Sequence, residues 1–195
     1  VSEQAFIAAA SENANAYGVY TTKEGTVDFD GDTTIIVSGD SGADRAVTTQ
    51  LGGEVNFNKG VRIVSEDYSL YATTNSAGGK QSAININQNG GSDVFITGDV
   101  IAANNAAINM RLDTAGSYFA GVATAVSGSS GNNGIVNLHL ANQARWDMAG
   151  NSSVSDVQNT GGSVIDMSAA TGYQKLTTGT FSGNGGVLIM DTDLD

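Results

Sequence analysis

Short segments in which apolar and polar residues alternate recur along the chain, and this repetition limits the possible folds more than any other feature. The segments are VDF at Val27, VNF at Val55, ININ at Ile84, INMRL at Ile108, VNLHL at Val136, IDM at Ile165 and the wholly apolar LIM at Leu188. Their first residues are 28, 29, 24, 28, 29 and 23 positions apart. A period in the twenties is typical of solenoids, in which each repeat forms one structural unit.

The alternation predicts strands with one buried face. In the segment at Val136 we expect Val136, Leu138 and Leu140 to point inward, and Asn137 and His139 to point outward. Second strands follow in most repeats: TTIIV at Thr33, VRIVS at Val61, DVFITGDV at Asp93, SYFAGV at Ser117 and RWDM at Arg145. Turn-forming clusters of Gly, Asn, Ser and Asp separate the strands, and helical periodicity is missing.

These patterns predict an all-β fold, a right-handed parallel β-helix (solenoid) with coils of 23 to 29 residues. The alternative is an antiparallel β-sandwich, in which turn signals recur about every 8 to 12 residues.

Composition limits the partners and the means of stabilisation. The chain has no Cys, so neither disulfides nor thiolate metal sites can form, and stability has to come from packing and hydrogen bonds. A net charge of -12 disfavours nucleic acid and anionic membranes as partners. No apolar run approaches the roughly 18 residues that a membrane-spanning helix needs.

The two ends of the chain carry separate expectations. Residues 187–190 read VLIM and are apolar on both alternating faces, so we expect a coil whose neighbour is missing and a native protein that continues past Asp195. Residues 1–16 are ambiguous, because their Ala run allows either a short helix that caps a coil or an irregular first coil.

The segment from Trp146 to the end resembles the last part of a pertactin-like autotransporter passenger domain. That family shows a Trp-x-Met/Leu-x-Gly-x-Ser-x-Val stretch, a Gly-Gly strand, a Tyr/Phe-x-x-Leu strand, and Gly-x-Gly-Gly before an apolar strand and an Asp-Leu. The matching residues are Trp146, Met148, Gly150, Ser152, Val154, Gly161, Gly162, Tyr173, Leu176, Gly183, Gly185, Gly186, Asp193 and Leu194. Residues 146–195 match closely, and the rest of the chain matches only in the style of its repeats.

This resemblance implies a location and partners. Residues 1–195 would be a single β-helix segment excised from a longer passenger, with residues 146–195 nearest to a folding-promoting cap and a membrane β-barrel that follow. The passenger would be displayed extracellularly, on the outer membrane of a Gram-negative cell. It would act as a non-enzymatic adhesin or self-association rod in cell aggregation and biofilm. Its partners would be host cell-surface or matrix molecules, or the same protein on neighbouring cells, and not nucleic acid.

Several motifs suggest chemistry, but each is better explained structurally. The GDSG string at residues 39–42 resembles the nucleophile motif of serine proteases, yet the one His, His139, follows Ser41 by almost a hundred residues, whereas those enzymes place His and Asp before Ser. Asp28, Asp30 and Asp32 form a D-x-D-x-D run that lacks the Gly and Glu of a calcium-binding EF-hand loop. We therefore predict no catalytic, cofactor-binding or metal-binding residue and no cofactor.

Arginines, aromatic residues and asparagines complete the set of candidates. Outward Arg62, Arg111 and Arg145 would suit a carbohydrate-active β-helix enzyme only if they formed one cluster. Trp146 alternates with Met148 and is assigned to the core. For Tyr68, Tyr71 and Tyr118 inward stacking is favoured over carbohydrate binding. The asparagines predicted to point outward could form hydrogen-bonded ladders or meet an identical surface on another cell; they are Asn56, Asn85, Asn87, Asn109 and Asn137.

Three classes of function remain open at this point. The first is a surface adhesin or aggregation rod, the second is a stalk and folding segment below an upstream functional head, and the third is a carbohydrate-active β-helix enzyme.

Overall fold

The chain forms an all-β structure. The computed structural model describes residues 4–74, 79–128, 132–168 and 170–191, and within these ranges it contains eighteen strands and no helix. The strands belong to one continuous sheet in which every ladder between named strands is parallel. A single antiparallel bridge, between Thr160 and Gly185, lies outside the strands of the described chain. The prediction of an all-β fold with parallel strands is therefore confirmed, and the antiparallel sandwich is wrong.

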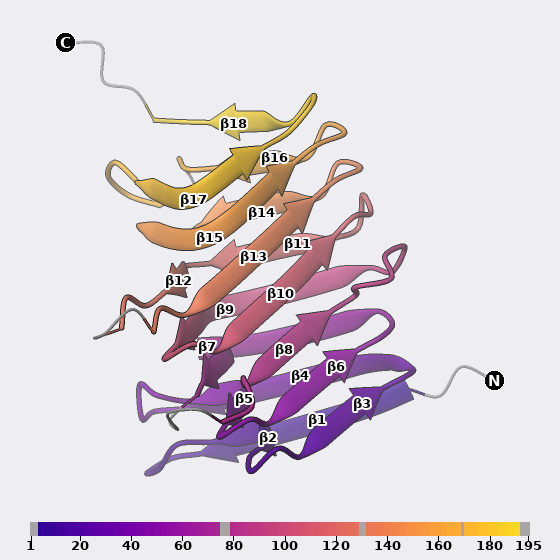
Figure 1. Ribbon diagram of the computed structural model, residues 1–195, viewed down its shortest axis with the longest axis vertical. Helices are drawn as coiled ribbons and strands as arrows, with labels where there is room; N and C mark the ends of the chain where they lie inside the picture. The colour runs from indigo at the N-terminus through magenta and orange to yellow at the C-terminus, as the bar shows by residue number, and fades with distance from the viewer. Residues whose placement is uncertain (1–3, 75–78, 129–131, 169, 192–195) are drawn as a thin grey trace.

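The strands stack in three columns along the long axis of the molecule (Figure 1). Column 1 contains β3 (Thr26–Phe29), β6 (Glu54–Phe57), β8 (Ala83–Ile86), β10 (Ala107–Leu112), β13 (Ile135–Leu140) and the second halves of β15 (Ser152–Asn159) and β17 (Leu176–Ser182). Column 2 contains β1 (Gln4–Ser11), β4 (Asp32–Gly39), the first parts of β7 (Val61–Thr73) and β9 (Val94–Ala103), β11 (Tyr118–Gly121), β14 (Arg145–Met148), β16 (Val164–Asp166) and β18 (Val187–Ile189).

Column 3 was not anticipated as a separate element. It contains β2 (Tyr17–Thr21), β5 (Arg45–Gln50), the second parts of β7 and β9, β12 (Ala123–Ala125), and the first parts of β15 and β17. The segments rich in Thr and Ala that form it show weaker alternation than those of column 1. Parallel stacking of this kind is compatible with a β-solenoid.

The register in column 1 follows the first repeats of the sequence. Val27 pairs with Val55, Val55 with Ile84, Ile84 with Ile108, and Ile108 with Val136. These pairings have the same spacings as the first four intervals of the repeat.

The last two repeats were assigned to the wrong column. Leu138 of β13 pairs with Val157, whereas Ile165 pairs with Trp146 and with Leu188. The segments IDM and LIM therefore continue column 2. The physical reason is that columns 1 and 2 both bury every second residue, so alternation by itself cannot tell one column from the other.

The core consists of the inward side chains of all three columns. Ile86, Leu138 and Trp146 are at most 1 % exposed, which confirms their inward assignment. The indole of Trp146 stacks on Phe119 with ring centroids 5.5 Å apart and donates a 3.1 Å hydrogen bond from Nε1 to the carbonyl oxygen of Gly121. Stacking large side chains on successive strands fills the interior, and the one polar atom of this indole is paired.

One glycine sits at the bend between columns 2 and 3. Gly98 of β9 has φ = 114°, and a Cβ atom at this position would lie 2.7 Å from the carbonyl oxygen of Ser65. The ladder between β7 and β9 shifts its register at the same place, between Val64 and Tyr68. A residue with a side chain could adopt this conformation only under strain.

At the two ends the structure corrects one expectation and leaves another untested. Residues 4–11 form β1, a strand that pairs in parallel with β4, so the helical alternative for this segment is wrong. At the other end β18 pairs with β16, and Val187 to Met190 are 37 to 59 % exposed. Continuation of the native chain past Asp195 stays a prediction, and Asp193 and Leu194 of the resemblance motif lie outside the described residues.

The described residues include no helix with the length and apolarity to cross a bilayer.

Candidate functional site

The outer face of column 1 carries a continuous ladder of asparagine side chains, which we call the asparagine ladder. Asn137 Nδ2 donates to Asn109 Oδ1 at 2.9 Å, and Asn109 Nδ2 donates to Asn85 Oδ1 at 2.8 Å. Asn85 Nδ2 donates to Asn56 Oδ1, and Asn56 Nδ2 donates to the carboxylate of Asp28, each at 2.8 Å. The four asparagines and Asp28 point outward from β13, β10, β8, β6 and β3, and the asparagines are half-buried. The predicted hydrogen-bonded ladder is therefore present.

All the amides of the asparagine ladder point the same way. Each N–H donates toward the N-terminal end of the stack, where the negative charge of Asp28 accepts the last bond. At the other end Asn137 is paired in register with Asp156, whose carboxylate accepts a hydrogen bond from Thr180 Oγ1. A side-chain amide has two N–H donors and an oxygen with two lone pairs, and the ladder uses one donor and one lone pair of Asn85 and of Asn109. Half of the hydrogen-bonding capacity of Asn109 is left for solvent or a partner, whereas Asn85 Nδ2 also donates to Glu54 Oε1 at 3.5 Å and Asn85 keeps only one lone pair of its oxygen.

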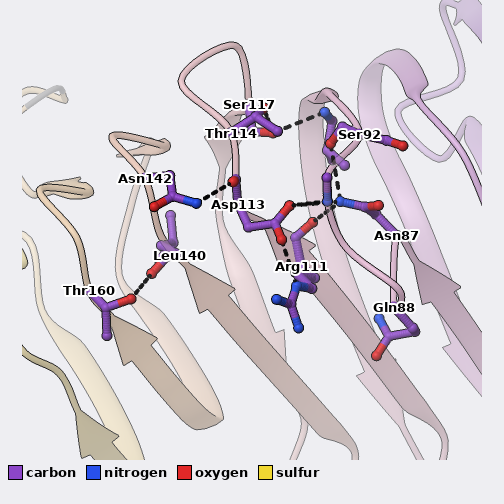
Figure 2. A network of polar contacts seen from close by, with 12 residues as sticks. Asn87, Gln88, Ser92, Arg111, Asp113, Thr114, Ser117, Leu140, Asn142 and Thr160 are labelled. Atoms are coloured by element: carbon purple, nitrogen blue, oxygen red, sulfur yellow. Dashed lines mark hydrogen bonds and ion pairs between the residues drawn. The ribbon is translucent and has the colours of Figure 1, made fainter.

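Asn87, which was predicted to point outward with the others, is instead buried. Its φ of 51° is left-handed and it is fully shielded from solvent at the turn that follows β8. Its Nδ2 donates to the carbonyl oxygens of Ser92 and Arg111 at 3.1 and 3.2 Å (Figure 2). The strand has ended at Ile86, so strict alternation no longer applies, and Asn is one of the few residues that tolerate this backbone conformation.

Asp113, which directly follows β10, contacts this turn and lies at the centre of a polar network (Figure 2). Its Oδ1 accepts hydrogen bonds from Asn87 Nδ2 at 3.2 Å and from the Gly91 amide at 2.9 Å, and its Oδ2 pairs with Arg111 Nε at 2.8 Å. Burial of the carboxyl would raise its pKa, but the hydrogen bonds and charge of Arg111, together with those from Gly91 and Asn87, outweigh burial, so the pKa of Asp113 lies below its ordinary value. The contacts with Asn87 and Gly91 join the turn after β8 to the turn after β10, and the ion pair with Arg111 joins the second of these turns to β10 itself, so the network holds successive turns together.

The D-x-D-x-D run is similarly engaged. Asp28 and Asp30 accept hydrogen bonds from the side chains of Asn56 and Asn58, both at 2.8 Å, and Asp32 accepts the Gly60 amide at 3.1 Å. Across the described ranges, no three His, Asp or Glu side chains gather closely enough to share a metal ion. The three carboxylates connect one turn of the stack with the next.

The structure does not bring Ser41 and His139 together. Ser41 lies in the turn after β4, and its hydroxyl donates to Asp44 Oδ1 at 3.2 Å. His139 lies on β13, which pairs with β10 and β15, whereas β4 pairs with β1 and β7. The imidazole is half-buried on the outer face, as predicted. Burial and the charge of Arg111 lower the pKa of His139 below its ordinary value, so the ring is largely neutral at pH 7.

The three arginines do not form one cluster. Arg111 is on column 1 and pairs with Asp113, whereas Arg62 and Arg145 share an outward row of column 2, with Phe95 and Tyr118 between them. Each of these two arginines instead contacts side chains on its own strand or on the next strand of the column. The guanidinium of Arg62 lies 4.3 Å from the ring centroid of Phe95, and Arg145 forms ion pairs with Asp147 at 2.6 Å and with Asp166.

A groove on the outer face of column 2 lies beside this row. Phe6, Arg62 and Phe95 line it together with two acids, Asp32 and Asp93. Asp32 is bonded to the Gly60 amide as described above, and Asp93 Oδ1 accepts a 2.5 Å hydrogen bond from Thr114 Oγ1. Both carboxylates thus take part in hydrogen bonds between neighbouring turns.

The inward prediction for three tyrosines is wrong. Tyr68, Tyr71 and Tyr118 are all partly exposed on the outer face. Tyr118 donates its hydroxyl to Asp147 at 2.8 Å, and burial and this hydrogen bond raise its pKa. Tyr68 and Tyr71 belong to a group that sequence reasoning missed, which we call the tyrosine patch: Tyr17, Tyr20, Arg45, Thr48, Tyr68 and Tyr71.

A sequence signal for the tyrosine patch exists. The motif Tyr-x-x-Tyr occurs twice, as YGVY from Tyr17 and as YSLY from Tyr68, and RAVT from Arg45 lies between them in the stack. The motif was not recognised because these strands belong to column 3, which alternation alone did not reveal.

Comparison of the chain with family models, curated proteins and solved structures found no match in any of the three.

Proposed function

We propose that the chain is part of a surface-displayed autotransporter passenger and acts as a non-enzymatic adhesin that mediates self-association of cells. In this proposal its parallel strands form a right-handed β-helix with coils of about 23 to 29 residues. The handedness is supported by a general rule: connections between parallel strands of one sheet are right-handed in about 98 % of cases.

The asparagine ladder is the observation that carries the proposal. Its amides are evenly spaced, because successive strands of a sheet lie about 4.8 Å apart. Asn109 keeps a donor and an acceptor that the protein itself does not use, and Asn85 keeps an acceptor. A second copy of the same ladder has complementary donors and acceptors at the same spacing, so two ladders can bond along their whole length.

Such contacts would be weak one by one. A net hydrogen bond contributes only about 0.5 to 1.5 kcal/mol, and polar surfaces must first lose water. Many copies on two cell surfaces add their contacts, and this multivalency converts a weak interface into stable attachment. The acidic balance of the chain keeps single molecules apart in solution, which suits a surface that associates only at high local density.

Two alternatives predict different uses of the same features. In a stalk, the asparagine ladder would serve only to stiffen the stack, and its outer donors and acceptors would remain with water. In a carbohydrate-active enzyme, Asp32 and Asp93 of the column 2 groove would exchange protons with substrate, although both now accept hydrogen bonds from neighbouring turns.

A settling assay tests the proposal on cells that display the protein. The test variant replaces Asn85, Asn109 and Asn137 by Arg. The matched control replaces three half-buried outward threonines of columns 2 and 3, Thr34, Thr97 and Thr124, by Arg and so adds the same charge elsewhere. Surface display of each variant is measured with an antibody.

We expect cells with the wild-type or control protein to settle faster than cells without it, and the ladder variant to lose this effect at equal display. If the ladder variant settles as fast as the wild type, self-association through this face is refuted and the stalk becomes the better explanation. If the control variant loses settling as well, charge alone accounts for the result and the ladder has no specific role.

A further inference from the structure

The tyrosine patch arranges six residues as a grid on the outer face of β2, β5 and β7. One row contains Tyr17, Arg45 and Tyr68, which are paired in register across the three strands. The other row contains Tyr20, Thr48 and Tyr71, paired in the same way. The tyrosines therefore occupy the four corners, and the middle strand contributes the arginine and the threonine. Adjacent strands lie about 4.8 Å apart, so the tyrosines of each row are separated by about 10 Å.

Ring contacts hold the grid in place. Tyr17 and Tyr20 meet edge to face with centroids 5.8 Å apart, and Tyr68 and Tyr71 meet in the same way at 6.0 Å. The guanidinium of Arg45 lies 3.8 Å from the ring centroid of Tyr71 and about 6 Å from those of Tyr17 and Tyr68. An arginine stacked on a ring has lost part of its freedom before any ligand arrives.

Arg45 has no acidic partner in this arrangement. No carboxylate of the described chain lies within ion-pair distance of its guanidinium, whereas Arg111 and Arg145 are both paired. Its Nε is buried without a hydrogen-bond acceptor, and the hydroxyl of Thr48, 1 % exposed, also lacks a partner. Both residues belong to β5, three positions apart, and their unpaired atoms leave hydrogen-bonding capacity unused within the patch.

The exposed rings define the shape of a ligand that fits the patch. Tyr17 is 39 % exposed and Tyr20 is 46 % exposed, in a chain whose aromatic content is low. A tyrosine offers a flat apolar face beside a hydroxyl and has few rotatable bonds to immobilise. Sugar rings have complementary surfaces, since a face of C–H groups is bordered by hydroxyls.

The charge of Arg45 and the net charge of the chain define the chemistry of the ligand. A single unpaired guanidinium matches a single carboxylate, which it can bind through two parallel hydrogen bonds. The chain has 20 acidic residues and 8 basic ones, so a polyanion would be repelled at long range. We propose that the tyrosine patch binds a glycan that carries one carboxylate, with the carboxylate on Arg45 and sugar rings stacked on Tyr17 and Tyr20.

This inference rests on the proposed function in one respect, because it names a ligand class for an adhesin on a cell surface. The two can fail separately. The asparagine ladder lies on column 1 and the tyrosine patch lies on column 3, and binding is measured with purified protein whereas settling is measured on cells.

The experiment compares 3′-sialyllactose, which has one carboxylate, with lactose, which has none. Each is titrated into isotope-labelled protein, and changes in the backbone amide NMR signals give both the affinity and the location of binding. The variants are Arg45→Gln, Tyr20→Ala and, as a matched control, Phe6→Ala, which removes another exposed ring (70 % exposed) on a strand outside the patch. Tyr20 has no ring contact with Arg45, so its replacement tests binding without disturbing the arginine stack.

We expect 3′-sialyllactose to shift signals of β2, β5 and β7, and lactose to bind at least about tenfold more weakly, because it lacks the charge-assisted hydrogen bonds. Arg45→Gln should remove that preference, Tyr20→Ala should weaken binding about tenfold, and Phe6→Ala should bind as the wild type does. No binding of either sugar, equal binding of both, or full binding by Tyr20→Ala would overturn the proposal and leave the patch as a structural stack.

Discussion

The prediction that tests the architecture most directly is the replacement of Leu138 by Asp. Leu138 is 1 % exposed and lies on the inward side of β13, where its register partners are Met110 and Val157. Neither neighbour can donate a hydrogen bond to a carboxylate. The new side chain would leave a cavity and bury a charge that has no partner.

The size of the effect follows from these two terms. Truncating a buried Leu to Ala costs about 2 to 5 kcal/mol. An unpaired buried charge costs about 3 to 5 kcal/mol more when it cannot be compensated. A domain of ordinary stability unfolds with a free energy of about 5 to 15 kcal/mol, so the Leu138→Asp protein should lose half or more of its stability.

Urea unfolding and limited proteolysis measure this loss. With a slope of about 2 to 3 kcal/mol per molar urea, the midpoint should fall by about 2 M or more, and protease should cut the chain near β13 under native conditions. Stacked repeats contact only their neighbours, so the damage should be greatest in the adjacent strands.

Two control variants make the result specific. Leu138→Met keeps the volume and should cost less than about 1.5 kcal/mol. His139→Gln, one residue further on the outer face, should change stability by no more than about 0.5 kcal/mol. If Leu138→Asp unfolds at the same urea concentration as His139→Gln, the assignment of inward and outward positions on β13 is wrong.

Three further predictions concern the ladder, the bend and the acid range. Asn109→Asp should lower the free energy of unfolding at pH 7 by about 1 kcal/mol, because an ionised carboxylate cannot donate a hydrogen bond to Asn85 Oδ1. Acidification should restore part of this loss as the carboxyl becomes protonated. Urea unfolding at pH 7 and pH 4 measures both effects, and equal losses at the two pH values would show that the donor is unimportant. Gly98→Ala should destabilise by about 1 to 3 kcal/mol, because φ = 114° strains any side chain and Cβ would lie 2.7 Å from Ser65 O, and an unchanged melting temperature would contradict this account of the bend. The pKa of Asp113 is lower in the folded protein than in the unfolded chain, so the carboxylate stabilises the fold above the unfolded pKa of about 3.9, and this stabilisation is lost as pH falls through the folded pKa. Asp113→Asn should therefore flatten the decline of the free energy of unfolding below about pH 4. A decline as steep as that of the wild type would show that other carboxyls cause it.

Sequence alone identified much of columns 1 and 2. Alternation with a period of two follows from strand geometry, so the inward Ile86, Leu138 and Trp146 and the stacked asparagines could be predicted residue by residue. The absence of Cys excluded disulfides and thiolate metal sites, and the acidic balance disfavoured nucleic acid and anionic membranes as partners. These properties depend on single residues and their immediate neighbours along the chain.

Tertiary structure decided everything that depends on which strand lies beside which. Alternation is the same in columns 1 and 2, so only the pairing of Ile165 with Trp146 could show which column the last repeats continue. The outward position of Tyr68 depends on the register shift in β7, and the burial of Asn87 depends on a left-handed turn. The tyrosine patch exists because three strands far apart in sequence, β2, β5 and β7, are hydrogen-bonded neighbours, and contacts between such strands are fixed by packing rather than by local pattern.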